Sequence, residues 1–129
     1  MNNSYFIEKA PHVGRLEELR ESDGVLSICI SFDDGKRAEY FFSRHVFFQK
    51  LDEGDAVLTL SEMATVDVLG KSFYTFRHSA LLSWFRRESA GIYDGVDLVH
   101  HRFCTIDDII DIISTCHEDG EPFFKELVS

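Results

Sequence analysis

Residues 105–118, TIDDIIDIISTCHE, are the most strongly patterned stretch of this chain of 129 residues. Thr105 is a typical N-cap residue, and Asp107 and Asp108 follow where the first turn of a helix favours anions. The apolar side chains recur at spacings of three, one and three residues, as in the buried stripe of an amphipathic helix. They are Ile106, Ile109, Ile110 and Ile113. The pattern therefore predicts a helix over residues 105–116 that buries the isoleucines.

An acidic face is expected on the other side of this helix and at the corner that follows it. It comprises Asp107, Asp108, Asp111, Glu118 and Asp119. An ordinary solvent-exposed helix face usually carries Lys or Arg four residues after such acids, and here those cations are absent. The face is either an ordinary solvated surface or the binding site for a basic partner, and we expect partner binding at these five residues.

The net charge of the chain is strongly negative and unevenly distributed. The sequence holds 23 Asp and Glu against 13 Lys and Arg, a formal charge of −10. Residues 88–129 carry 10 acids and 2 bases, so −8 of the −10 lies in this last third. Such asymmetry indicates an electrostatic partner, while the acidic balance argues against direct binding of nucleic acid, which needs a basic surface.

The remaining patterns predict a mixed fold. Strands are expected over 4–8, 25–32, 37–42, 56–61, 65–69, 73–76 and 96–103, with a hairpin turn at Asp33–Gly35. Helices are expected over 15–20, over 44–51 after Ser43, from Ser79 to about Glu88, over 105–116, and in a short segment from Pro122 to Leu127. The prediction is one α+β domain spanning 1–129, with an antiparallel sheet of about four to six strands and three or four helices.

Composition indicates in which cellular compartment the protein is expected. No apolar stretch is long enough for a membrane span, and the N-terminus lacks a basic segment followed by an apolar run, so we expect no membrane association and no cleaved signal. Three cysteines, an odd number, indicate reduced thiols and a cytoplasmic location. The sequence contains no cofactor-binding motif, so we expect no cofactor.

A metal site is the first alternative, built from His100, His101, Cys104, Cys116 and His117. On the predicted helix, a rise of 1.5 Å per residue places the two cysteines about 16–18 Å apart. Ligands of one zinc ion must each lie within about 2.3 Å of it. We therefore expect no metal site.

Two further alternatives remain open. Cys104 lies just before a predicted helix, where a thiol acidifies, and with His100 or His101 it defines a candidate cysteine-dependent enzyme. Neither an oxyanion hole nor an orienting Asn is recognisable, so we expect no catalysis. A homo-oligomeric interaction module using the aromatic side chains is the second alternative.

In size, acidity and clustered carboxylates, the chain resembles the small acidic immunity proteins of bacteria, which neutralise toxins of the contact-dependent, colicin and polymorphic types. The resemblance lies in this profile and covers no alignable motif. It implies a protein that inhibits a cognate nuclease toxin. A nuclease is basic because its substrate is a polyanion, and an acidic inhibitor is steered to it electrostatically.

Overall fold

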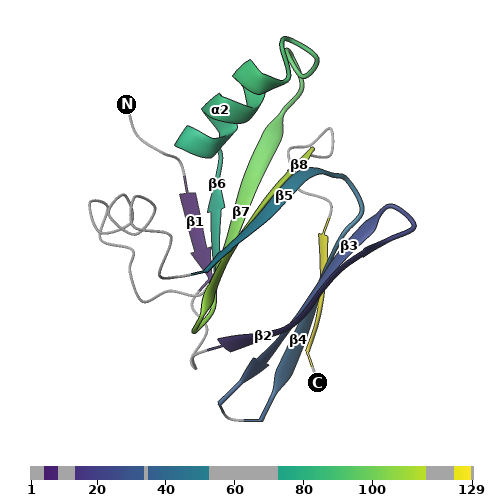
Figure 1. Cartoon of the computed structure of the whole chain (residues 1–129), viewed down its shortest axis with the longest axis vertical. Coiled ribbons are helices and arrows are strands. Elements are labelled where there is room, and N and C mark those ends of the chain that lie inside the picture. Colours follow the sequence, from purple (N-terminus) through teal and green to yellow (C-terminus); the bar gives the residue numbers. More distant parts are fainter. Residues whose placement is uncertain (1–4, 9–13, 34, 53–72, 116–123, 129) are drawn as a thin grey trace.

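Two antiparallel β-sheets packed face to face, with one helix on the outside, form the described part of the chain (Figure 1). The computed structural model describes residues 5–8, 14–33, 35–52, 73–115 and 124–128. The elements are β1 (Tyr5–Glu8), β2 (Gly14–Ser22), β3 (Val25–Phe32), β4 (Arg37–Phe42), β5 (His45–Asp52), β6 (Phe73–Phe76), α2 (Ala80–Glu88), β7 (Leu98–Cys104), β8 (Asp108–Thr115) and β9 (Phe124–Val128).

The strand orders are β1-β6-β7-β8-β5 in the first sheet and β2-β3-β4-β9 in the second. The chain passes from the second sheet to the first between β4 and β5, through residues 43 and 44. At the opposite end, the Ile106 N–H in the β7–β8 turn donates to the Gly14 carbonyl at 2.8 Å, which ties the first sheet to the start of β2. Each sheet therefore presents one face to the other.

The main core fills the space between the sheets. From the second sheet, alternate residues of β3 and β4 point inward, including Ile28 and Phe42. From the first sheet, Phe103, Ile110 and Ile112 meet them, and the rings of Tyr40 and Phe103 lie 4.7 Å apart. Since buried aliphatic and aromatic area dominates folding free energy, this layer holds the two sheets together.

A second, smaller core lies on the outer face of the first sheet, beneath α2. Leu82 and Phe85 of the helix pack with Leu98 of β7 and Ile113 of β8. Ser79 caps the helix: its hydroxyl accepts a hydrogen bond from the Leu82 N–H at 3.1 Å. The predicted helix over this segment and its cap are confirmed.

The hairpin at Asp33–Gly35 is also confirmed. The strands on either side span Val25–Phe32 and Arg37–Phe42, as predicted. Gly35 adopts a φ of +87°, which glycine accepts without a steric penalty, and its N–H donates to the Phe32 carbonyl at 3.0 Å. The predicted strands over 4–8, 73–76 and 96–103 correspond to β1, β6 and β7, whereas those over 56–61 and 65–69 lie outside the described residues.

The predicted α+β class with three or four helices is wrong, because the described residues of four predicted helices form strands. In β2 the pairing shifts between Leu16 and Glu18, and this bulge lets Leu16 and Leu19, three residues apart, both pack against the core. In β5 a spacing of four, as between Phe47 and Leu51, also returns to one face of a strand. The short terminal helix is likewise wrong, since the described residues 124–128 form β9.

The helix predicted over 105–116 is the fourth error, because its residues from Asp108 to Thr115 form β8. This strand lies between β7 and β5, with the second sheet over one face and α2 over part of the other. All residues from 109 to 114 are therefore buried, and a short apolar run of this kind fits a helix as well as a strand. Ile106, predicted to be buried, is 44% exposed in the β7–β8 turn.

Among the described residues, no helix is long and apolar enough to cross a membrane.

Candidate functional site

The predicted acidic face does not form a continuous surface. Asp111 is fully buried within β8, whereas Asp107 lies in the β7–β8 turn and Asp108 begins the strand. Glu118 and Asp119 lie outside the described residues. The helix that was expected to align the five carboxylates is absent, and strand geometry separates Asp111 from the other two.

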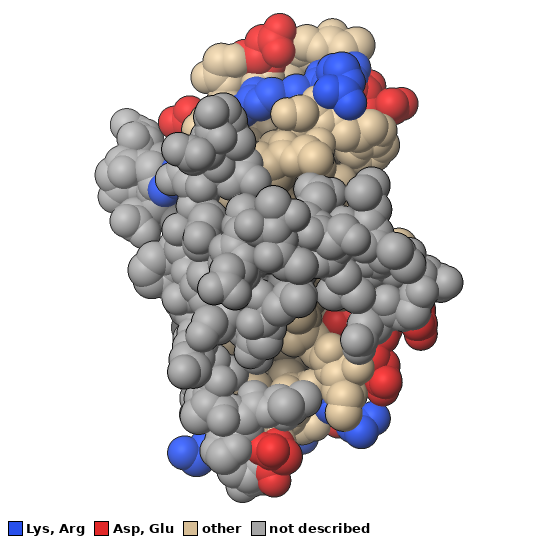
Figure 2. Space-filling model, turned by 90° about the vertical axis from the view of Figure 1, so that its left-hand side faces the viewer, with Lys and Arg blue, Asp and Glu red and all other residues tan. Residues whose placement is uncertain are grey.

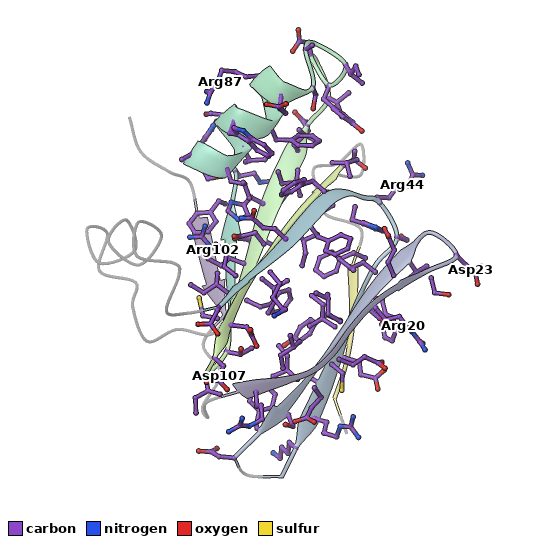
Figure 3. All side chains as sticks on the ribbon, in the orientation of Figure 1. Arg20, Asp23, Arg44, Arg87, Arg102 and Asp107 are labelled. Atoms are coloured by element: carbon purple, nitrogen blue, oxygen red, sulfur yellow. The ribbon has the colours of Figure 1, made fainter. Side chains whose placement is uncertain are left out.

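Asp107 and Asp108 each pair with a cation from another strand. Asp107 lies 3.4 Å from the Arg15 guanidinium, and both side chains are about two-thirds exposed. Asp108 lies 3.3 Å from the Lys50 ammonium group. Figure 3 shows Asp107 at the end of the first sheet, beside β2. An exposed pair such as that of Asp107 with Arg15 contributes at most about 1 kcal/mol, so the Asp107 carboxylate remains available to a partner's cation.

Asp111 is instead the centre of a polar cluster on the outer face of the first sheet, formed with Gln49, His100 and Arg102. Its Oδ1 atom lies 2.6 Å from His100 Nε2 and accepts from Arg102 Nε at 2.7 Å. Its Oδ2 atom accepts from Gln49 Nε2 at 3.1 Å. His100 and Asp111 are completely buried, and a carboxylate in such a place needs these donors to offset its desolvation.

The register of three strands explains how these residues meet. Asp111 lies directly opposite Arg102 on β7 and Gln49 on β5, and His100 lies two residues before Arg102 on the same face. The Arg102 guanidinium also lies 5.4 Å from the centre of the Phe76 ring, in a cation–π arrangement. The cluster is thus fixed by neighbouring strands and an aromatic ring.

The electrostatics of the cluster keep Asp111 ionised. Burial raises the pKa of its carboxyl, but the hydrogen bond from His100 and the charges of His100 and Arg102 outweigh that effect, and the pKa falls to about 2. The Asp111 carboxylate is therefore charged at neutral pH although it is buried, and its interactions with His100 and Arg102 offset the cost of its desolvation.

His101 belongs to the other face of β7 and to the core between the sheets. Its ring lies 5.1 Å from that of Phe42, and its Nδ1 atom is 3.3 Å from the Thr75 hydroxyl. Burial, followed by the charges of His100 and Arg77, lowers the pKa of His101 to about 3. His101 is therefore a neutral core residue at physiological pH.

Ser79 connects the polar cluster to the surface. Its hydroxyl oxygen lies 2.8 Å from His100 Nδ1, on the side of the ring opposite Asp111. Ser79 also lines a pocket of about 430 Å³. The pocket is bounded by Arg77, His78, Ser79, Leu82, Ser83, Arg86, Asp97 and Leu98. Sequence reasoning found Ser79 only as a helix cap.

The structure does not pair Cys104 with either histidine as a catalytic dyad. Cys104 is four residues from His100 along the same extended strand, a separation of about 13 Å between Cα atoms. His101 points to the opposite face. Cys116 and His117 lie outside the described residues, so the predicted distance between the two cysteines has no counterpart here, and the described histidines, cysteines and acids contain no group of three suited to a metal ion.

Comparisons of the chain with protein-family models, curated proteins and solved structures found no match.

Proposed function

We propose that this protein binds and neutralises a basic protein, and that the partner is a nuclease toxin for which it is the immunity protein. The observation that carries this proposal is the formal charge of −10, from 23 acids against 13 bases. A basic protein approaching this chain is attracted at distances up to about a Debye length, roughly 8–10 Å at physiological salt. Association therefore accelerates without any contact having formed.

We place the interface around the β7–β8 turn. The Asp107 side chain is 66% exposed, and a partner's Lys or Arg can replace its exposed ion pair with Arg15 at little cost. The Asp108 side chain is 19% exposed and adds a second negative charge at the same end of the sheet. The burial of Asp111 removes it from any contact surface. Glu118 and Asp119, which follow the other end of β8 in the sequence and lie outside the described residues, remain proposed contacts apart from this turn.

Elsewhere the described charges are mixed. Figure 2 shows basic and acidic side chains next to one another at the end of the molecule that carries α2. Arg86 of α2 donates to the carbonyls of Tyr93 and Val96, each at 2.8 Å, and so serves the local structure. Charges of both signs also lie at the opposite end in Figure 2, so the choice of the β7–β8 turn depends on the exposure of Asp107.

The test uses the basic protein encoded immediately upstream of this gene, purified with its active site inactivated. We expect tight binding whose association rate falls as NaCl rises from about 50 to about 500 mM. The Asp107→Asn/Asp108→Asn variant should bind at least tenfold more weakly, a loss of about 1.4 kcal/mol, and should protect cells poorly from the toxin.

The matched control is Glu18→Gln/Asp23→Asn, which removes the same charge from β2 and the following turn. It should retain most of the affinity. Equal loss of affinity in both variants would show that binding depends on the net charge and not on the β7–β8 turn. Absence of binding to the upstream protein at low salt would contradict the proposed function.

A further inference from the structure

Three side chains from three elements form a continuous hydrogen-bonded chain that ends at a pocket. Ser79 precedes α2, His100 lies on β7 and Asp111 lies on β8. The Ser79 hydroxyl oxygen is 2.8 Å from one ring nitrogen of His100, and the other ring nitrogen is 2.6 Å from the Asp111 carboxylate. Ser79 lines the pocket, whereas the other two residues are buried behind it.

The protons along this chain are assigned by the partners. An ionised Asp111 can only accept, so His100 Nε2 carries a proton and donates it to the carboxylate. When His100 is uncharged, its Nδ1 atom is an acceptor and takes the hydrogen bond from the Ser79 hydroxyl, and this is the form that can act as a base. The Leu82 N–H donates to the same hydroxyl oxygen, at 3.1 Å, which leaves the hydroxyl proton directed at His100.

Asp111 is well suited to position His100. Arg102 and Gln49 hold both of its oxygens, so the carboxylate cannot turn away from the imidazole. A fixed carboxylate selects the tautomer in which the other ring nitrogen is free to accept a proton, and it stabilises the imidazolium that results. These are the requirements for activating a serine by general-base catalysis.

The pocket supplies the other two requirements, which are anion stabilisation and substrate binding. The pocket lies at the N-terminal end of α2, where Ser79 and Leu82 line it and where the helix dipole attracts negative charge. Arg77 and Arg86 line the pocket with one acid, Asp97, and Arg86 keeps its positive charge while it donates to the Tyr93 and Val96 carbonyls. Its volume of about 430 Å³ suits a small molecule.

We propose that Ser79 and His100 form a hydrolytic site for small esters whose acyl group carries a negative charge. The Ser79 oxygen attacks the ester carbonyl while its proton passes to His100 Nδ1. The carbon–oxygen bond to the alcohol then breaks, and the alcohol leaves with that proton. Water hydrolyses the acyl-serine by the same transfers, which regenerates the Ser79 hydroxyl and releases the acid. This activity does not rest on the proposed toxin binding.

The first experiment treats the full-length protein with a fluorophosphonate probe and locates the adduct by peptide mass spectrometry. We expect one adduct per chain, on Ser79. The Ser79→Asn variant is the decisive comparison, because asparagine still caps a helix but has no nucleophilic hydroxyl. It should fold and remain unlabelled, whereas the control Ser27→Ala, on the second sheet, should label like the wild type.

The second experiment measures hydrolysis of the p-nitrophenyl monoester of succinic acid and of p-nitrophenyl butyrate. The charged ester should be hydrolysed faster, and Ser79→Asn should lower that rate at least a hundredfold. Asp111→Asn should move the inflection of the pH–rate profile to lower pH, because the imidazolium of His100 loses its counterion, a shift that a purely structural role would not produce.

Labelling of Ser79 together with a preference for the charged ester supports the proposal. A folded wild-type protein that neither labels at Ser79 nor hydrolyses either ester above background would overturn it, and Ser79 would then be a helix cap only. Faster hydrolysis of the neutral ester would overturn the assignment of an anionic substrate.

Discussion

Replacing Asp111 by alanine should be among the most damaging single changes to the stability of this protein. The change removes a carboxylate with no exposed surface and leaves three donors without their acceptor, on Gln49, His100 and Arg102. Removing one member of a buried charged pair typically costs about 3–5 kcal/mol, because the remaining charge stays buried without a counterion. For a chain of this size, that corresponds to a fall of about 10–20 °C in Tm.

The matched control is Asp107→Ala, which removes the same group four residues earlier. Its ion pair with Arg15 spans 3.4 Å between side chains that are 66% and 60% exposed, so the change should stay within about 0.5 kcal/mol of the wild type. Urea unfolding at pH 7 measures both variants, with the fluorescence of Trp84, the single tryptophan, as the signal. If both variants lost less than about 1 kcal/mol of unfolding free energy, the burial of Asp111 would be refuted, and an exposed position on a helix would be the better description.

Three other changes follow from the core and the cap. His101 has a pKa near 6.5 when unfolded and about 3 when folded, so the stability that it contributes above pH 6.5 is lost as pH falls below that value. Between pH 7 and pH 4.5, urea unfolding should show that His101→Leu loses about 2–3 kcal/mol less stability than the wild type, and parallel losses would contradict this. Gly14→Ala places a Cβ 2.6 Å from Ile30 and should cost about 1–3 kcal/mol in thermal unfolding, so an unchanged Tm would count against this packing. Ser79→Ala should lower the free energy of unfolding by about 1 kcal/mol, because the helix cap is lost, whereas Ser79→Asn should retain most of that stability. Equal stability of the alanine variant and the wild type in urea would show that Ser79 does not stabilise the helix as a cap.

Elements whose signals are local were predictable from the sequence. The β3–β4 hairpin is encoded by strict alternation on both sides of a turn that contains Gly35, and α2 by a serine cap ahead of an apolar stripe. In each case residues within about ten positions determine the structure. No knowledge of distant partners was needed.

The strands mistaken for helices depend on distant partners. In β8, Ile109, Ile110 and Ile113 are buried as predicted, but so is Ile112, because the strand has neighbours on both sides and cover on both faces. The apparent helical spacing arises because every residue from 109 to 114 is buried, and exposed Ile106, buried Asp111 and buried Ile112 all depart from the predicted helix. In β2 the bulge before Glu18 replaces the alternation on which strand recognition relies.

The polar cluster was not predicted, although its residues were visible. The sequence pattern suggests His100 as a partner of Cys104 or of a metal ion, and Asp111 as part of an exposed helix face. Their meeting requires the register of the β7–β8 pair, in which Asp111 lies opposite Arg102. A single charged residue within an apolar strand was the available signal, since burial of such a residue demands partners on the neighbouring strands.

The most direct test of this account is the titration of the Asp111 side chain by carbon-13 NMR, with its carboxyl resonance assigned. The central claim is that Asp111 is a buried carboxylate held by His100 and Arg102, so its carboxyl shift should stay constant from pH 7 to about pH 3 and reveal a pKa of about 2. The backbone shifts of residues 109–113 should be those of a β-strand. A pKa near the ordinary value of 3.8, together with helical backbone shifts, would contradict the account.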